Sequence, residues 1–292
     1  MHGQALTIEL DSPDDWPGFR AACRALLAHG ADPAAVRWRW PDTRGAQPLG
    51  AGVDLFSSAP QQAMPASALA GLAGPGEAGL SLSDTQMSAL RHACMHRAAG
   101  RFELCHRWLA RMQARPELRL DALDADWRAI EALARPVSRE IHKMHAFVRF
   151  RTTQRQNLPE LHIAWFEPEH HIVRAAAPFF CKRFANMHWA ILTPQCSVHW
   201  DGHALRLAPG ARRSDAPPAD AGEALWLTYY ASTFNPARLK EQAMLREMPR
   251  RYWKNLPETV LISTLVQQAR ARTGQMLEQQ PREAWQRGRS TP

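Results

Sequence analysis

Hydrophobic positions recur along this chain with two different periods, and the period changes near residue 147. In the first half, apolar residues return every three to four positions, which is typical of amphipathic helices. They predict helices over residues 19–28, from Ser83, after Gly100, and from Asp124 or Asp126. Ser83 and Gln86 have the spacing of a capping box. Short strands are predicted on either side of the first helix, over residues 7–10 and 36–40.

From residue 147 the apolar residues alternate with polar ones, which is the period of a β-strand. Strands are predicted over residues 147–151, 161–166 and 189–193, and a hairpin over 198–207 with Asp201-Gly202 as its two-residue turn. A helix over residues 172–184, bent at Pro178, separates the second and third of these strands. Further helices are predicted over 225–231, 237–246 and 260–272. We therefore expect an α+β fold with a small, mainly antiparallel sheet packed against several helices.

Composition divides the chain into four parts. Residues 1–40 form an N-terminal strand–helix–strand element, and residues 41–82 are rich in Pro, Gly and Ala, as in a linker or insertion. Residues 83–272 carry the main α+β domain, in which Pro136 is expected to interrupt or kink the long helix. Residues 273–292 form a polar tail.

The charge is distributed unevenly. Residues 1–90 contain five Arg against nine Asp or Glu, whereas residues 91–292 contain 31 Lys or Arg against 19 Asp or Glu. A basic surplus confined to one region indicates a polyanionic partner, nucleic acid first and an anionic membrane second. A solvated, arginine-rich surface explains the same surplus equally well.

The five cysteines are far apart and form no C-x-x-C pair, which fits reduced thiols in the cytoplasm. The N-terminus lacks the features of a secretory signal, and no apolar stretch approaches the roughly twenty residues of a membrane-spanning helix. We expect a cytoplasmic protein without a membrane segment. Patterns for a P-loop, a dinucleotide-binding turn and a G-x-S-x-G nucleophile are absent, and no cofactor is predicted.

Histidines and carboxylates are concentrated in one central stretch. It contains His142, His145, His170, His171, Glu140, Glu167 and Glu169. His142 and His145 lie on one face of a predicted helix. Pro168 suits the first turn of the next helix, where the helix dipole favours neutral imidazoles.

His142, His145, Glu169 and His171 are therefore candidate catalytic residues. The same set could hold zinc, manganese or iron, but no H-E-x-x-H or zinc-deaminase pattern is present, and we assign no metal ligands. A polar patch facing phosphate is the alternative.

Basic and aromatic residues are interleaved in two segments. The candidates for phosphate binding are Lys143, Arg149, Arg151, Arg238, Lys240, Arg250, Arg251 and Lys254. Cations neutralise phosphates while flat rings stack on exposed bases, so Tyr252 or Trp253 is the candidate base-stacking residue. The alternative is that the aromatics are core residues and the arginines a solvated face.

Five segments carry a family resemblance: IHKMHAFVRF (141–150), WFEPEHHIV (165–173), WAILTP (189–194), YYASTFNPARLK (229–240) and MPRRYWKNLP (248–257). Over about residues 83–272 the chain resembles a bacterial DNA-metabolism or DNA-repair family built on a domain of unknown function. Its members stand beside a radical-SAM DNA-repair protein or are fused to a uracil-DNA-glycosylase-like domain.

The resemblance implies a DNA-binding accessory protein of a bacterial DNA repair system that acts on single-stranded or damaged DNA. Its partner would be the radical-SAM protein or the uracil-DNA-glycosylase-like protein. This chain lacks the G-Q-D-P-Y-like and H-P-S-P-like loops of the glycosylase, so uracil excision would need another polypeptide. The alternative is a histidine/carboxylate enzyme, with or without metal assistance, that acts on damaged nucleic acid.

Overall fold

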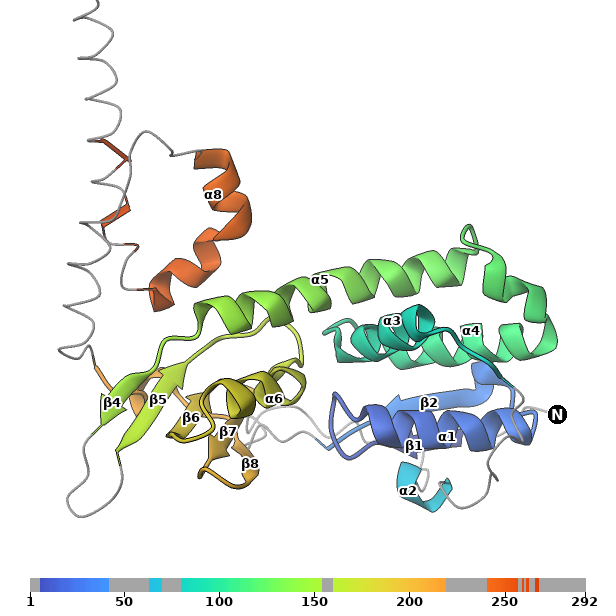
Figure 1. Cartoon of the computed structure of the whole chain (residues 1–292). Helices are drawn as coiled ribbons and strands as arrows, with labels where there is room; N and C mark the ends of the chain where they lie inside the picture. Colours follow the sequence, from blue (N-terminus) through green and yellow to red (C-terminus); the bar gives the residue numbers. More distant parts are fainter. Residues whose placement is uncertain are drawn as a thin grey trace, which may run out of the picture.

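The protein consists of two lobes joined by one long helix (Figure 1). The computed structural model describes residues 6–41, 63–69, 80–153, 160–218 and 241–256, together with Thr259 and residues 261–262 and 266–267. The predicted helix over 225–231 and most of the one over 260–272 lie outside these residues. Helices and two sheets pack together, which confirms the α+β class.

The first lobe begins with a parallel sheet. Its elements are β1 (Leu6–Glu9), α1 (Trp16–Ala28), η1 (Pro33–Ala35), β2 (Val36–Arg39), β3 (Met64–Pro65) and α2 (Ala66–Leu69). Strands β2 and β3 pair with β1 on its two sides, both in parallel. The strand–helix–strand prediction is confirmed. The reading of residues 41–82 as a linker missed β3 and α2, whose Ala66 and Leu69 are buried in the core of this lobe.

Two helices cover this sheet and a third continues beyond it. They are α3 (Asp84–Met95), α4 (Arg101–Ala114) and α5 (Ala125–Phe147), with η2 (Pro116–Leu120) between the last two. The capping box is confirmed: the backbone N–H of Gln86 donates to Ser83 Oγ at 3.2 Å, and that of Ser83 donates to Gln86 Oε1 at 3.0 Å. Asp124 caps α5 by accepting from the backbone N–H of Trp127 at 3.0 Å.

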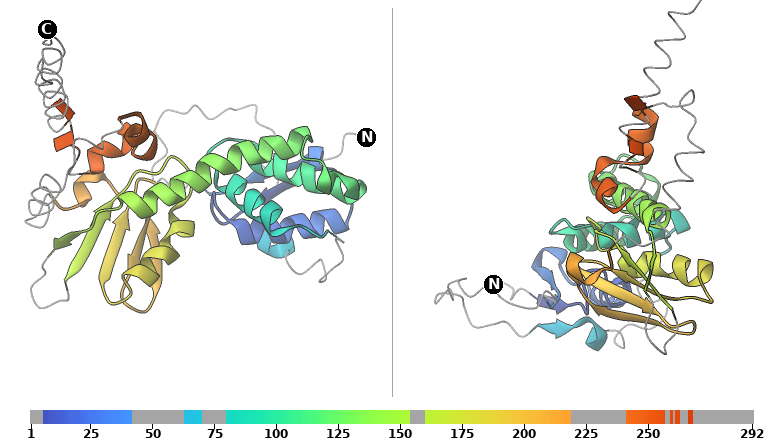
Figure 2. Two further views of the ribbon diagram at one scale, coloured as in Figure 1. Left: turned by 45° about the horizontal axis from the view of Figure 1, so that its top comes forward. Right: turned by 90° about the vertical axis from the view of Figure 1, so that its left-hand side faces the viewer.

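Helix α5 belongs to both lobes (Figure 2). Trp127 and Ile130 lie in the core of the first lobe, whereas Val137 and Met144 lie in the core of the second. The helix continues through Pro136, so the predicted interruption is wrong. It also extends to Phe147, so the strand predicted over 147–151 is wrong there, and β4 begins only at Arg151. The apolar alternation of that stretch reflects the last turn of α5 leading into the sheet.

The second lobe is a five-stranded sheet in the order β4-β5-β6-β7-β8, with helix α6 (Val173–Arg183) on one face. The strands are β4 (Arg151–Thr153), β5 (Leu161–Trp165), β6 (His188–Leu192), β7 (Cys196–Trp200) and β8 (Leu205–Pro209). Strands β5 and β6 pair in parallel across α6, and the other three pairings are antiparallel. The mainly antiparallel sheet is thus confirmed.

The β7–β8 hairpin has a longer loop than predicted. Trp200 pairs with Leu205, so four residues form the connection instead of the two of Asp201-Gly202. Asp201 Oδ1 accepts from the backbone N–H groups of His203 at 3.0 Å and Ala204 at 2.8 Å. These bonds favour the wider loop, in which Gly202 takes a φ of 88°.

Three short elements complete the described chain. They are η3 (Arg213–Asp215), α8 (Glu241–Glu247) and η5 (Arg250–Asn255). Tyr252 and Leu256 are buried in the core of the second lobe, so the end of the described chain packs against α5 and the sheet. No helix among the described residues is long and apolar enough to span a membrane.

Candidate functional site

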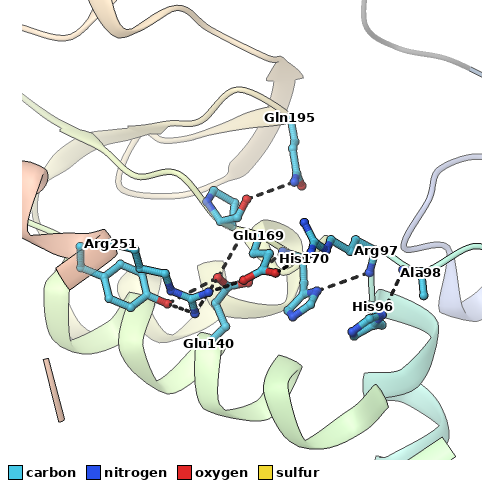
Figure 3. A network of polar contacts seen from close by, with 10 residues as sticks. His96, Arg97, Ala98, Glu140, Glu169, His170, Gln195 and Arg251 are labelled. Carbon is cyan, nitrogen blue, oxygen red and sulfur yellow. Dashed lines mark hydrogen bonds and ion pairs between the residues drawn. The ribbon is translucent and has the colours of Figure 1, made fainter. Parts of the chain in front are cut away.

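A buried carboxylate on α5 organises the loop between β5 and α6, which we call the 166–172 loop. Glu140 is 1% exposed. Its Oε1 accepts from the backbone N–H of Glu169 at 2.9 Å, and its Oε2 accepts from that of His170 at 2.8 Å (Figure 3). Burial raises the pKa of the Glu140 carboxyl, and the two backbone hydrogen bonds act against that rise. The loop is therefore fixed to a helix about thirty residues earlier in the chain.

These bonds correct one prediction about the histidines. Helix α6 begins at Val173, so Glu169 and His171 lie in the preceding loop and not in a first helical turn. Contacts with α5 and with the end of α3 hold residues 169–171 in the loop: their N–H groups donate to Glu140 and, from His171, to Met95 O at 2.9 Å. The first bond of the helix runs from the N–H of Ala176 to Ile172 O at 2.9 Å. The helix-dipole argument for neutral imidazoles consequently does not apply there.

Two arginines from distant segments meet at Glu169. Arg97, in the α3–α4 connection, places Nη2 3.1 Å from Glu169 Oε1, and Arg251 of η5 contacts Glu169 Oε2. Arg251 also donates to the Tyr252 hydroxyl at 2.6 Å and lies 3.4 Å from Glu140 Oε1. Burial, together with the charge of Glu140, raises the pKa of Tyr252 to about 12. Three segments of the chain thus converge on one loop (Figure 3).

Two further histidines belong to this network. The rings of His96 and His170 lie 4.3 Å apart between centroids, and His170 Nδ1 accepts from the backbone N–H of Arg97 at 3.4 Å. Burial, followed by the charges of His170 and Arg101, lowers the pKa of His96 to about 4, and burial also lowers that of His170. Both imidazoles are therefore neutral at pH 7.

The sequence reading missed Glu140 and His96 as site residues. The sequence does contain a pattern that predicts the burial of Glu140. This residue lies three residues after Val137 and four before Met144, on the apolar face of α5. A carboxylate on a buried helix face needs partners, and such partners mark an organised site. No comparable pattern surrounds His96, which ends α3 and meets its partner only through the fold.

The predicted catalytic set does not gather in one place. His142 is exposed on α5, whereas His145 has Nε2 3.2 Å from Ala176 O and stacks on Phe179 of α6 with ring centroids 4.1 Å apart. Burial lowers the pKa of His145. In the described part of the chain, no group of three or more His, Cys, Asp or Glu side chains could hold a metal ion. Glu169 joins the Glu140 network instead, and His171 lines a cavity on the other side of the loop.

Several predicted phosphate-binding cations make contacts within the protein. Lys143 pairs with Glu247 at 3.0 Å and also donates to the Glu247 carbonyl. Arg149 Nη1 donates to Ala146 O at 2.7 Å, and Arg151 Nη1 donates to Pro217 O at 2.8 Å. These contacts help to stabilise the second lobe. Arg238 and Lys240 lie outside the described residues.

Residues 99–258 match the family described as a domain of unknown function, DUF4130. The chain belongs to this family. No curated protein and no solved structure matches the sequence. The DUF4130 domain includes Glu140, the 166–172 loop and Arg251, whereas His96 and Arg97 precede it. The network of Figure 3 is therefore completed by a segment just outside the family domain.

Three exposed cations contact the 166–172 loop, and a fourth is adjacent to one of them in the chain. We call Arg97, Arg250, Arg251 and Lys254 the cationic rim; the DUF4130 domain supplies all but the first. The side chains of Arg97, Arg251 and Lys254 are 63%, 48% and 58% exposed. Lys254 contacts Glu167, and the Arg250 guanidinium lies 5.8 Å from the ring centroid of Trp253. Cations and an aromatic ring thus occur together at one surface.

The two predicted base-stacking residues differ in exposure. Tyr252 is 2% exposed and packs against Phe166 with ring centroids 5.6 Å apart, so it is a core residue. Trp253 is half-buried and donates through Nε1 to Met248 O at 2.9 Å. The stacking prediction therefore remains with Trp253 alone.

Proposed function

We propose that this protein binds single-stranded or damaged DNA as an accessory protein of a bacterial DNA repair system. The observation that carries the proposal is the cationic rim, in which three exposed cations from two distant segments contact the 166–172 loop and the exposed Arg250 is the chain neighbour of one of them. Guanidinium groups suit phosphate because their planar fork can donate two parallel hydrogen bonds. The basic surplus of residues 91–292 supports the same reading.

The two carboxylates that pair with the rim cations, Glu167 and Glu169, oppose phosphate binding only weakly. Glu167 and Glu169 are about one-third exposed, and their partners are more exposed still. Ion pairs in such surroundings contribute roughly 0–1 kcal/mol each. A phosphate can therefore replace a carboxylate at Arg97 or Lys254 at little cost, while the loop stays fixed by Glu140.

The half-buried ring of Trp253 favours single-stranded or distorted DNA over a regular duplex. A ring beside phosphate-binding cations can stack on an unpaired base, which a regular duplex does not offer. The family resemblance indicates the partner of this proposal, which is a radical-SAM DNA-repair protein or a uracil-DNA-glycosylase-like protein. Because the chain lacks the glycosylase loops, that partner would perform the chemistry on the DNA.

A salt titration tests the proposal. We expect the affinity for a labelled single-stranded oligonucleotide, measured by fluorescence anisotropy, to fall with a log–log slope of about −1.4 to −2.8, since two to four phosphate contacts contribute about −0.7 each. Between 50 and 200 mM salt this corresponds to a loss of about 7- to 50-fold. The fully paired duplex of the same sequence should bind more weakly. An affinity that does not change with salt, or no binding at the lowest salt, contradicts the proposal.

The second candidate is an enzyme with a histidine/carboxylate site that acts on damaged nucleic acid. What favours it is the Glu140 network, where a carboxyl of raised pKa adjoins the neutral imidazoles of His96 and His170. Its residues thus differ from the predicted set, in which only Glu169 touches this network. Recovery of chemically unchanged DNA, with base, abasic and strand-break lesions each tested, would remove this candidate.

A further inference from the structure

A cavity of about 250 Å³ lies where the two lobes meet. One wall is the segment after β1, residues 11–14, and the others come from the 166–172 loop with the start of α6, from Gln195 after β6, and from β8. Strands β1, β5 and β6 all take part in parallel pairings, and the chain leaves each of them at its carboxyl end. Ligands of open α/β sheets bind outside the carboxyl ends of such strands.

The polar groups of this cavity are held in place. The Asp14 side chain is only 11% exposed; it accepts from Ser12 Oγ at 2.8 Å and lies 3.5 Å from Arg174 Nε across the two lobes. Ser12 itself is buried. Gln195 donates through Nε2 to Pro168 O at 3.2 Å, which fixes its side chain against the 166–172 loop (Figure 3). A ligand would therefore meet a preformed set of acceptors and donors.

The remaining surface of the cavity is apolar. Val173 of α6 and Leu207 and Pro209 of β8 line it, together with the Cys196 side chain, whose thiol pKa burial raises to about 11. The thiol is thus protonated and acts as part of the apolar wall. Apolar walls combined with oriented polar groups suit a flat heterocycle that carries N–H donors and carbonyl acceptors at its edge.

The charged lining residues and the volume of the cavity restrict the class of ligand further. Two carboxylates, Asp11 and Asp14, line the cavity with one guanidinium, that of Arg174, which already contacts Asp14. The buried Arg101 lies behind the wall and donates to Pro13 O at 2.6 Å. The lining itself therefore does not favour a phosphate. The volume is below the roughly 300–1,000 Å³ of pockets for drug-sized ligands, so one or two fused rings fit. We propose that this cavity binds a nucleobase, presented either by a free nucleoside or by a nucleotide extruded from DNA.

The cavity and the cationic rim share the 166–172 loop. His171 lines the cavity, while Glu169, two residues earlier, contacts Arg97 and Arg251 of the rim. A DNA strand on the rim could thus place one base in the cavity while its phosphates stay outside. Only this second source of the base rests on the proposed function; binding of a free nucleoside stands independently of it.

Two titrations distinguish the sources. In the first, the nucleosides adenosine, guanosine, cytidine and thymidine are titrated separately into the full chain by calorimetry. In the second, oligonucleotides that carry 2-aminopurine are followed by fluorescence, which increases when the base leaves the stack. Ala208→Phe fills the cavity from β8, and Ala204→Phe, the same change in the exposed hairpin loop, is the matched control. Asp14→Asn removes the fixed carboxylate with little change of shape.

We expect heat of binding with at least one nucleoside or a fluorescence increase with DNA. Ala208→Phe should weaken that response at least about tenfold, which is about 1.4 kcal/mol. Asp14→Asn should weaken it too, whereas Ala204→Phe should not. Affinity for DNA, measured by anisotropy, should stay within about twofold in Ala204→Phe, and its salt dependence should be the same in all three variants because the phosphate contacts of the rim are untouched. Thermal melting confirms that each variant folds.

Absence of both signals, or a response that survives Ala208→Phe in a folded protein, overturns the proposal. Failure of DNA binding alone removes the proposed function and leaves the nucleoside titration to decide the cavity. Strong DNA binding without either signal keeps the proposed function and removes the nucleobase pocket.

Discussion

Replacing Glu140 with alanine is expected to lower the free energy of unfolding by about 2–4 kcal/mol, because two backbone N–H groups lose their acceptor at a cost of about 1–3 kcal/mol each. The substitution leaves the backbone N–H groups of Glu169 and His170 without their acceptor. It also leaves Arg251 and the Tyr252 hydroxyl without this carboxylate. Since alanine is a good helix former, the loss does not come from α5 itself. Urea denaturation followed by tryptophan fluorescence measures the change.

Glu131→Ala is the matched control because Glu131 lies on the same helix and, within the described part of the chain, pairs only with Arg135, at i,i+4 on the surface. Its loss should stay below about 0.5 kcal/mol. Hydrogen exchange adds a local measurement, in which the amides of residues 169 and 170 lose protection in Glu140→Ala before those of α6 do. A loss in Glu140→Ala no larger than that in the control would show that Glu140 does not anchor the loop.

Reversing the charge of two rim residues, in the double variant Arg97→Glu with Arg250→Glu, is expected to weaken single-stranded DNA binding by about 30- to 100-fold at low salt. Each change removes a phosphate contact and introduces a repulsive charge beside the path of the strand. Arg251 is left intact because it also contacts Glu140, so its loss would disturb the loop. Anisotropy titrations of the folded variant give the affinity directly.

The control for this experiment is the pair Arg119→Glu and Arg128→Glu. Both residues are exposed in the first lobe, on η2 and at the start of α5, and the pair changes the net charge by the same amount. Long-range electrostatics alter equally in the two double variants, so only a local contact separates them. We expect the control to weaken binding by less than about threefold. Equal losses in both variants would mean that the net charge, and not the cationic rim, attracts the DNA.

Local patterns in the sequence predicted the elements that local forces determine. Ser83 and Gln86 satisfy each other's backbone donors within one turn, so their spacing alone located the start of α3. For α5 the sequence left Asp124 and Asp126 as alternatives, and the structure shows Asp124 as the cap. The two apolar periods separated the helices from the sheet, and the α+β class followed from them.

Contacts between distant segments account for what the sequence reading missed. Pro168 favours a helix start, but contacts of residues 169–171 with Glu140 and Met95 hold them in a loop, and α6 begins only at Val173. Pro136 lies inside α5 without ending it, since packing against two lobes holds the helix on both sides. Propensity acts within a few residues, and tertiary contacts override it.

In the site, too, local patterns predicted some features and contacts between distant segments determined the others. The interleaving predicted that cations and aromatic rings lie together, as Arg250 and Trp253 do, but not that Tyr252 faces the core. Arg97 escaped notice because it lies more than forty residues before the other charged segments, and only the fold brings it to Glu169. Side-chain direction and long-range pairing depend on packing, which residue spacing does not encode.

The central claim is that DNA lies along the cationic rim, and photo-crosslinking tests it most directly. A single-stranded oligonucleotide carrying 5-iododeoxyuridine is irradiated with the full chain, and the attached peptides are identified by mass spectrometry. Because this group reacts preferentially with aromatic side chains in contact with it, we predict attachment at Trp253. The adducts should disappear in the Arg97→Glu, Arg250→Glu variant. Adducts confined to the parallel sheet and α1, within residues 6–41, would contradict the claim.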